Sequence, residues 1–179
     1  MKKITNFLFI SLLIANVSCS RYEEMKPLGY SYTPEMFEYT SYGFDGGFTI
    51  NFHKDSFWYS AHEGEKKRRY RLPAPSFEAW NRFWDAMNDV ELWLWAAEYE
   101  NTDPNIIISG GEHWHLKIAK QSKSMSSSGN NCYPSDDDVR KSGYPLGDRT
   151  QRYMAFENAV RELFNLKSLY LENGIASEG

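Results

Sequence analysis

The sequence "GGEHWHLKIA" at residues 110–119 places two histidines around a tryptophan, and its alternation decides how this part of the chain folds. Successive side chains of a β-strand point to opposite faces of the sheet. A strand here would bury its apolar side chains, which are Trp114, Leu116 and Ile118. Its other face would be polar and would carry His113 and His115. The alternation therefore predicts a half-buried strand.

The polar stretch "SKSMSSSG" at residues 122–129 predicts a second strand, which pairs with the first through a turn at about residues 119–122. Zinc requires three or four protein ligands, and this strand face offers two histidines. His53 and His62 lie in an earlier segment that the pattern does not bring near. We therefore expect a solvent-exposed strand face without metal or other cofactor. A metal site at His113 and His115 is the alternative.

The first 18 residues have the order of a secretory signal: two lysines, an apolar run over residues 4–14, and then small residues. Val17-Ser18-Cys19 resembles the end of a bacterial lipoprotein signal, in which the cysteine is lipidated. Asn16 stands where such signals usually carry leucine. We expect removal of residues 1–18 and anchoring of the chain to a membrane of the bacterial cell envelope through lipidated Cys19. Secretion is the alternative if Cys19 is not lipidated.

The charge excludes a nucleic-acid partner. The whole chain has a net charge of −4, and removal of residues 1–18 takes away two lysines and leaves −6. Nucleic-acid binding requires a basic surface. The one basic run, "KKRR" at residues 66–69, alternates into "YRL" and is typical of the solvated edge of a strand. If Cys19 is lipidated, Cys132 has no disulfide partner. If Cys19 is not lipidated, a Cys19–Cys132 disulfide is possible.

The chain divides into a signal peptide, a tether and a single domain. Residues 19–42 are rich in Tyr, Ser, Thr and Pro and show no clear period, so they are predicted to form the tether. The domain is predicted to occupy residues 43–179. Within it, "GGFTINFH" (46–53), "SFWYSA" (56–61) and "KRRYRLP" (67–73) have strand character and predict a three-stranded meander.

Two segments have helical period. Ser76 is a natural N-cap, and the following residues carry an apolar stripe of Phe77, Trp80, Phe83, Trp84 and Met87. Thr150 caps a last helix, whose predicted buried residues are Tyr153, Phe156, Val160, Leu163 and Phe164. Between the helices, "ELWLWAAEY" at residues 91–99 is predicted as a further strand. The order βββα-βββα predicts an α+β domain: a six-stranded, mostly antiparallel sheet with both helices packed on one face.

An aromatic surface is the candidate binding region. In a strand at 91–99, Trp93, Trp95 and Tyr99 would point away from the helices. Tryptophans on an open sheet face indicate a binding surface, unless the tether or a loop covers them or the strand is buried on both faces. The loop at 130–149 is long enough to suggest a function, and its two Tyr-Pro pairs could anchor it on this face. The candidate binding surface therefore comprises Trp93, Trp95, Tyr99, Tyr133 and Tyr144.

Known catalytic motifs are absent from the sequence, and no catalytic residue is predicted. Cys132 could act as a nucleophile with His113 or His115 as its base. A small packed thiol is the other interpretation, since free cysteines are often simply buried.

Several positions between residues 76 and 166 resemble a widespread group of small uncharacterised bacterial domains. That group shares the pattern W-x-x-x-Y, then D-G-x-x-W-x-L-x-I, then G-x-N-x-Y-P before a final helix. The matching residues here are Trp95, Tyr99, Gly111, Trp114, Leu116, Ile118, Gly129, Asn131, Tyr133 and Pro134. Gly110 stands in place of the aspartate, and Cys132 in place of a small residue such as alanine. The resemblance implies an α+β domain without a known activity and carries over no catalytic residues.

The sequence as a whole predicts a lipid-anchored, non-catalytic binding module of the cell envelope. Its partners would be the membrane, through Cys19, and an envelope protein or another ligand. The alternative function is an envelope hydrolase or metal-binding protein that uses His113 and His115.

Overall fold

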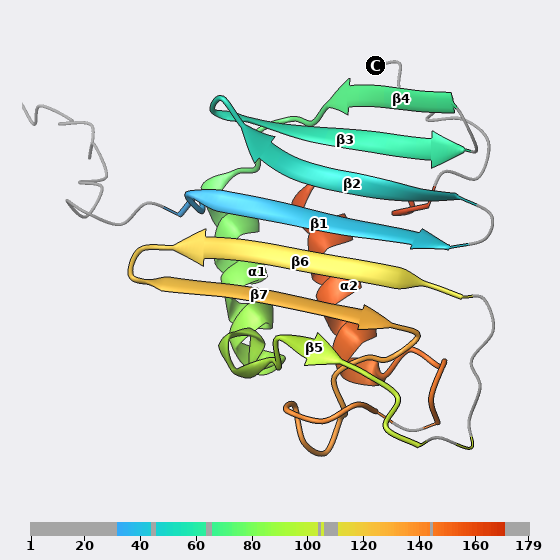
Figure 1. Cartoon of the computed structure of the whole chain (residues 1–179). Helices are drawn as coiled ribbons and strands as arrows, with labels where there is room; N and C mark the ends of the chain where they lie inside the picture. Colours follow the sequence, from blue (N-terminus) through green and yellow to red (C-terminus); the bar gives the residue numbers. More distant parts are fainter. Residues whose placement is uncertain are drawn as a thin grey trace, which may run out of the picture. The chain divides into compact units, whose positions relative to one another are not determined.

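Figure 1 shows the computed structural model, which describes residues 32–43, 46–63, 66–103, 105, 111–143 and 145–170. The strands of this part form one sheet in the order β4-β3-β2-β1-β6-β7-β5. Their bounds are Met36–Gly43 (β1), Gly46–His53 (β2), Ser56–Glu63 (β3), Lys66–Arg71 (β4), Glu98–Tyr99 (β5), His113–Lys120 (β6) and Lys123–Asn130 (β7). Helices α1 (Phe77–Asp89) and α2 (Gln151–Leu163) cover the same face of the sheet (Figure 1).

The predicted α+β class with a mostly antiparallel sheet is confirmed, but the predicted number of strands is wrong. The described sheet has seven strands, and β5 pairs with β7 in parallel while the other pairs are antiparallel. The helices leave the opposite face uncovered, and polar side chains such as Glu38 and Lys117 lie on it. We call this opposite face the open face.

The additional strand is β1, which lies in the middle of the sheet and overlaps the predicted tether. Phe37, Tyr39 and Ser41 are fully buried, whereas Glu38 and Thr40 between them are partly exposed. β1 pairs with β2 on one side and with β6 on the other. The tether prediction is therefore wrong for residues 36–42; its part from 19 to 31 lies outside the described residues.

The hairpin predicted from residues 113–129 is confirmed. β6 and β7 pair antiparallel, with His115 opposite Ser128, and the chain turns at Gln121, which has a positive φ of 56°. The indole of Trp114 is buried on the helix-covered face, while His113 points to the open face. The alternation of "HWHLKIA" thus fixes which face of the sheet receives the helices.

Both predicted helix caps are present. Ser76 Oγ accepts a hydrogen bond from the backbone N–H of Ala79, and Thr150 Oγ1 accepts one from that of Tyr153. The predicted apolar residues of α2 are all buried, and those of α1 are buried except Phe77, which is 49% exposed. No helix in the part of the chain that the structure describes is long and apolar enough to cross a membrane.

Residues 91–99 do not form the strand that their aromatic density suggested. Glu91 adopts a left-handed conformation with φ of 53°, and a short 3-10 helix, η1 (Leu92–Leu94), follows it. The indole N–H of Trp95 donates to the backbone oxygen of Val90 at 2.9 Å. Strand geometry returns for two residues, at β5. The segment is therefore a compact turn that leads into β5 at the edge of the sheet.

Candidate functional site

The predicted aromatic binding surface is wrong, because most of its side chains belong to the core. Trp95, Tyr99 and Tyr133 are at most 6% exposed. Trp93 is partly buried, with its ring stacked on Trp84 at 6.3 Å between centroids. Tyr144, the fifth member, lies outside the described residues. Buried rings stabilise the fold and are not available to a partner.

The two histidines of β6 lie on the open face, as predicted. His113 stacks on Tyr42 with ring centroids 5.6 Å apart. His115 lies 3.3 Å from the hydroxyl of Ser126 and 3.7 Å from a carboxylate oxygen of Glu38. Burial and the neighbouring Lys117 lower the pKa of His115 in spite of that carboxylate.

Both imidazoles line a shallow hollow of about 690 Å³ beside β5. Within the described ranges, no group of three or more His, Cys, Asp or Glu side chains is arranged to hold a metal ion. The structure thus places His113 and His115 on the predicted face, and neither belongs to such a group in this part of the chain.

Cys132 is buried, with 1% of its surface exposed. Burial raises the pKa of its thiol, although a hydrogen bond with Ser142 acts in the opposite direction. Glu100 is the other polar group that acts on the thiol. A nucleophilic cysteine needs a lowered pKa, so these surroundings fit the packed thiol.

The residues that carry the family resemblance hold the end of the β6–β7 hairpin together. The indole N–H of Trp114 donates to the backbone oxygen of Cys132 at 2.9 Å. A Cβ on Gly129 would lie 2.1 Å from that same oxygen. Asn131 Oδ1 accepts a hydrogen bond from the backbone N–H of Glu112, the residue after Gly111, at 2.7 Å. These positions therefore have a structural role.

The loop after β7 is tied down by its polar groups. Both carboxylate oxygens of Asp136 accept backbone hydrogen bonds from the first turn of α2, one from Gln151 at 3.1 Å and one from Arg152 at 2.7 Å. This geometry satisfies N–H groups that a helix start leaves unpaired. The described part of the loop therefore serves the fold, with Tyr133 and Val139 buried beneath it.

A group of buried charges, which sequence reasoning missed, lies between the sheet and α2. We call Glu112, Arg149 and Glu157 the buried charge cluster. Arg149 donates from Nε to Oε2 of Glu112 at 2.8 Å and from Nη1 to Oε2 of Glu157 at 3.1 Å. The two carboxylate side chains are 12% and 9% exposed, and that of Arg149 is 35% exposed.

Hydroxyl groups complete the hydrogen bonding of this cluster. Tyr39 donates to Oε1 of Glu157 at 3.0 Å, and Tyr133 donates to Oε2 of Glu112 at 2.9 Å. Ser41 and Tyr170 also donate to Glu112. The two carboxylates are thus bound by protein donors from the sheet, the loop and the residues after α2.

The environments of the two carboxylates separate their pKa values. Burial raises the pKa of Glu157 to about 7, against the opposing charge of Arg149. Burial also acts to raise the pKa of Glu112, but hydrogen bonds from Ser41 and Tyr170 and the charge of Arg149 outweigh it, so this pKa is lowered. Such separation is typical of acid–base pairs, and it also arises in structural ion pairs. The donors that surround both groups favour the structural role.

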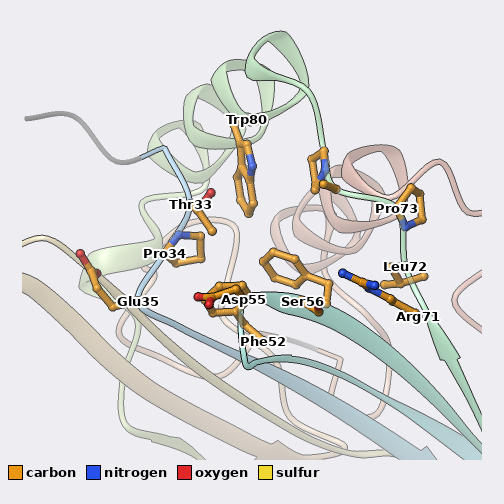
Figure 2. Close-up of a pocket in the computed structure, with 13 residues that line it drawn as sticks. Thr33, Pro34, Glu35, Phe52, Asp55, Ser56, Arg71, Leu72, Pro73 and Trp80 are labelled. Atoms are coloured by element: carbon orange, nitrogen blue, oxygen red, sulfur yellow. The ribbon is translucent and has the colours of Figure 1, made fainter. Parts of the chain in front are cut away.

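A second feature that sequence reasoning missed is a cleft of about 850 Å³ at one end of the sheet. We call it the proline-rimmed cleft. Its rim holds Pro34, Pro73 and Pro75, and its walls include the aromatic rings of Phe57 and Trp80, whose centroids are 5.7 Å apart. Figure 2 shows Trp80 reaching down from α1 on one side of the cleft, opposite the start of β3.

Three charged side chains line the cleft, and they differ in their bonding. The carboxylate of Glu35 accepts the backbone N–H of Gln121, at 2.9 and 3.1 Å to its two oxygens, so it already supports the β6–β7 turn. Asp55 and Arg71 are exposed and make no ion pair with any other described residue. The cleft therefore combines an aromatic interior with one free charge of each sign.

The sequence carried a partial signal for the cleft. The strand predicted at residues 67–73 ends at Pro73, and this boundary is correct, because Leu72 makes the last backbone hydrogen bond to Phe57 at 2.9 Å. The approach of residues 33–35 to Pro73 and Pro75 could not be foreseen, because that segment was assigned to the tether.

Comparisons with protein-family models, with curated proteins and with solved structures found no match to this chain. The resemblance to small bacterial domains stays a prediction. Any functional assignment therefore rests on the chain's own geometry, and the proline-rimmed cleft is the candidate site that combines aromatic rings with charges of both signs.

Proposed function

We propose that this protein is a non-catalytic binding module of the bacterial cell envelope and that its ligand binds in the proline-rimmed cleft. The supporting observation is the combination of a cleft of about 850 Å³, aromatic rings in its walls and two charges, Asp55 and Arg71, that no described residue pairs. Ligand sites are typically concave, mostly apolar and about 300–1,000 Å³ in volume, with a few polar groups that orient the ligand.

The cleft suits a ligand with an apolar ring and charges of both signs. A ring would pack against the half-buried ring of Phe52, a carboxylate would meet Arg71, and an ammonium group would meet Asp55. A free aromatic amino acid has this chemistry. Phe57, whose ring centroid lies 4.7 Å from that of Phe52, and Trp80 are buried and support this ring from the core.

Titration calorimetry with phenylalanine, its N-acetyl derivative and its amide tests this assignment. Phenylalanine should bind best, because each derivative removes one charge. Arg71→Gln should abolish the preference for the free carboxylate, and Asp55→Asn should abolish the preference for the free amine. Arg68→Gln, an exposed arginine outside the cleft, is the control. Equal binding of all three compounds, or no binding, would contradict the proposal.

The anchor belongs to the same proposal and rests on the sequence of the first 19 residues. In a bacterial host, Cys19→Ala should move the protein from the membrane fraction to the soluble fraction and should prevent incorporation of labelled palmitate. A membrane-bound, unlabelled wild-type protein would contradict the lipid anchor. Binding of phenylalanine in the cleft is independent of this outcome.

A further inference from the structure

The two edges of the sheet differ in a way that bears on partner binding. At one edge lies β5, which has two residues. At the other lies β4, which has six residues and, among the described strands, pairs with β3 and no other. The register between β3 and β4 runs one-to-one without a bulge, and β4 contains no proline. β4 is therefore a regular strand whose second side pairs with no described strand.

The hydrogen bonding shows which residues of β4 face outward. Leu72, directly after β4, donates its N–H to the oxygen of Phe57 on β3 at 2.9 Å. Backbone direction alternates along an antiparallel strand. Tyr70 and Arg68 must then also direct their backbone groups toward β3. It follows that Arg71, Arg69 and Lys67 direct their N–H and C=O groups away from the sheet.

Lys67 and Arg69 place their side chains on the open face, whereas Arg71, at the end of β4, lines the proline-rimmed cleft. Lys67 and Arg69 pair with His62 and Ser60 of β3, and the guanidinium of Arg69 lies 4.2 Å from the ring centroid of Trp58. Tyr70, on the other face, lies near the buried Tyr59. Each of the outward-facing residues of β4 therefore combines a backbone donor and acceptor that no described strand pairs with an exposed cationic side chain.

We propose that β4 accepts an extended acidic segment of a partner protein as an additional antiparallel strand, with a carboxylate at every second position of that segment. In an antiparallel pair, directly opposed residues place their side chains on the same face. Carboxylates opposite Lys67 and Arg69 would therefore meet cations while the backbones complete the ladder. Such strand addition is a common mode of peptide recognition.

The charge of β4 supports an acidic partner. Five of its six residues are Lys or Arg, although the whole chain has a net charge of −4. Charged residues on edge strands also protect against aggregation, and charges of either sign serve that purpose. Bulges, prolines and short length, which also protect edge strands, are absent from β4. Their absence leaves this strand able to pair.

Fluorescence anisotropy with labelled peptides tests the inference. The probe is a six-residue peptide of alternating glutamate and valine with blocked ends. Its comparison is a peptide with three glutamates followed by three valines, which has the same charge. The alternating peptide should bind several-fold more tightly, since each matched cross-strand pair contributes about 0.2–1 kcal/mol, or up to about fivefold in affinity. Equal binding of the two peptides would overturn the inference.

Backbone methylation separates strand addition from simple charge attraction. In an antiparallel pair, the N–H groups of the glutamates would face β4 and those of the valines would face solvent. N-methylation of the glutamates should abolish binding, whereas N-methylation of the valines should leave it within about twofold. Two results would contradict the proposed antiparallel ladder. One is loss of binding when the valines are N-methylated, and the other is retained binding when the glutamates are N-methylated.

Protein variants locate the site on β4. Lys67→Gln and Arg69→Gln should each weaken binding of the alternating peptide by about two- to fivefold. Arg68→Gln is the matched control. Arg68 is exposed and lies on the opposite face of β4, and its substitution removes the same charge from the same strand. An equal loss in all three variants would indicate a diffuse electrostatic effect and would overturn the inference. Phenylalanine binding in the cleft should be unchanged by Lys67→Gln, so the two proposals fail separately.

Discussion

Arg149 donates a hydrogen bond from Nη1 to Oε2 of Glu157 across 3.1 Å, and this bond joins the end of the long loop to helix α2. The other side of the same guanidinium binds Glu112, just before β6. One cation therefore lies between two carboxylates that are both nearly buried. Its removal would leave like charges in a region of low polarity, where they are costly.

Arg149→Met should lower the free energy of unfolding by about 3–5 kcal/mol, because two buried carboxylates lose their cation. Urea denaturation followed by circular dichroism gives the value. Arg161→Gln is the control: this arginine lies on α2, is more exposed, and approaches Glu162 at 4.0 Å. Its substitution should change stability by less than about 0.5 kcal/mol. Similar stabilities of the two variants would show that the cluster adds little.

Glu157 should make stability depend on pH. Its pKa is raised by burial to about 7 in the folded protein, from an ordinary value of 4.5. Between these pH values the folded state holds more protons than the unfolded state, so the free energy of unfolding falls as pH rises. Glu157→Gln cannot ionise. From pH 4.5 to 8, its stability should therefore rise relative to the wild type, by roughly 1–3 kcal/mol.

Denaturant titrations of wild type and variant at several pH values measure this difference. Glu162→Gln, an exposed carboxylate on the same helix, should leave the shape of the pH profile unchanged. A difference between Glu157→Gln and wild type that stays constant over this range would contradict a raised pKa at Glu157.

Trp95→Ala should destabilise the fold by about 3–5 kcal/mol, as expected for truncation of a buried aromatic residue. The ring packs on Trp114 and Phe156 at 5.9 and 5.4 Å between centroids, and its N–H is bonded to a backbone oxygen. Leu94→Ala, one position earlier and 47% exposed, should cost under about 1 kcal/mol. Thermal unfolding distinguishes them, and a stable Trp95→Ala protein would restore the prediction of an exposed aromatic surface.

Gly129→Ala and Gly147→Ala separate packing from backbone strain. A Cβ at Gly129 would lie 2.6 Å from the indole nitrogen of Trp114, so the substitution should cost about 3 kcal/mol. Gly147 has φ of 92° but nothing within 4 Å of its Cβ position, so its substitution should cost about 1 kcal/mol through conformation only. Chemical denaturation of both variants checks this order, and the reverse order would mean that strain outweighs packing.

The elements that the sequence predicted are those whose buried positions are apolar. The meander of β2, β3 and β4, the hairpin of β6 and β7, and the inward stripe of α2 all follow simple alternation or helical period. The N-caps Ser76 and Thr150 could be predicted because the capping hydrogen bond is local. Most inward positions of these segments hold large apolar or aromatic side chains, although Ser127 of β7 is fully buried and donates to the backbone oxygen of Ala96.

β1 escaped prediction because two of its inward positions carry hydroxyl groups. Tyr39 and Ser41 are fully buried, and their hydroxyls are satisfied by Glu157 and Glu112. Both carboxylates come from distant parts of the chain, so the alternation was hidden without the tertiary fold. The sequence does contain a signal for a buried carboxylate. Glu157 lies four residues after Tyr153 and three before Val160, on the buried stripe of α2.

Residues 91–99 were mistaken for a strand because tryptophans at alternate positions imitate a strand pattern. The left-handed conformation at Glu91 and the bond from Trp95 to Val90 fold this segment back on itself. Aromatic density indicates burial here, but it does not distinguish a strand from a compact turn. The candidate site failed for the same reason, since the rings that seemed available to a partner fill the interior.

The position of β1 has a consequence for how the protein acquires its structure. β1 comes first among the described strands, yet its second neighbour, β6, begins at His113. Until residues 113–120 leave the ribosome or a translocation channel, the strand that carries Phe37 and Tyr39 lacks the hydrogen-bonding partner β6 on one side. Such long-range pairing forms slowly and leaves intermediates prone to aggregate. We expect the nascent chain to depend on a holding chaperone, and a fragment that stops before His113 to precipitate.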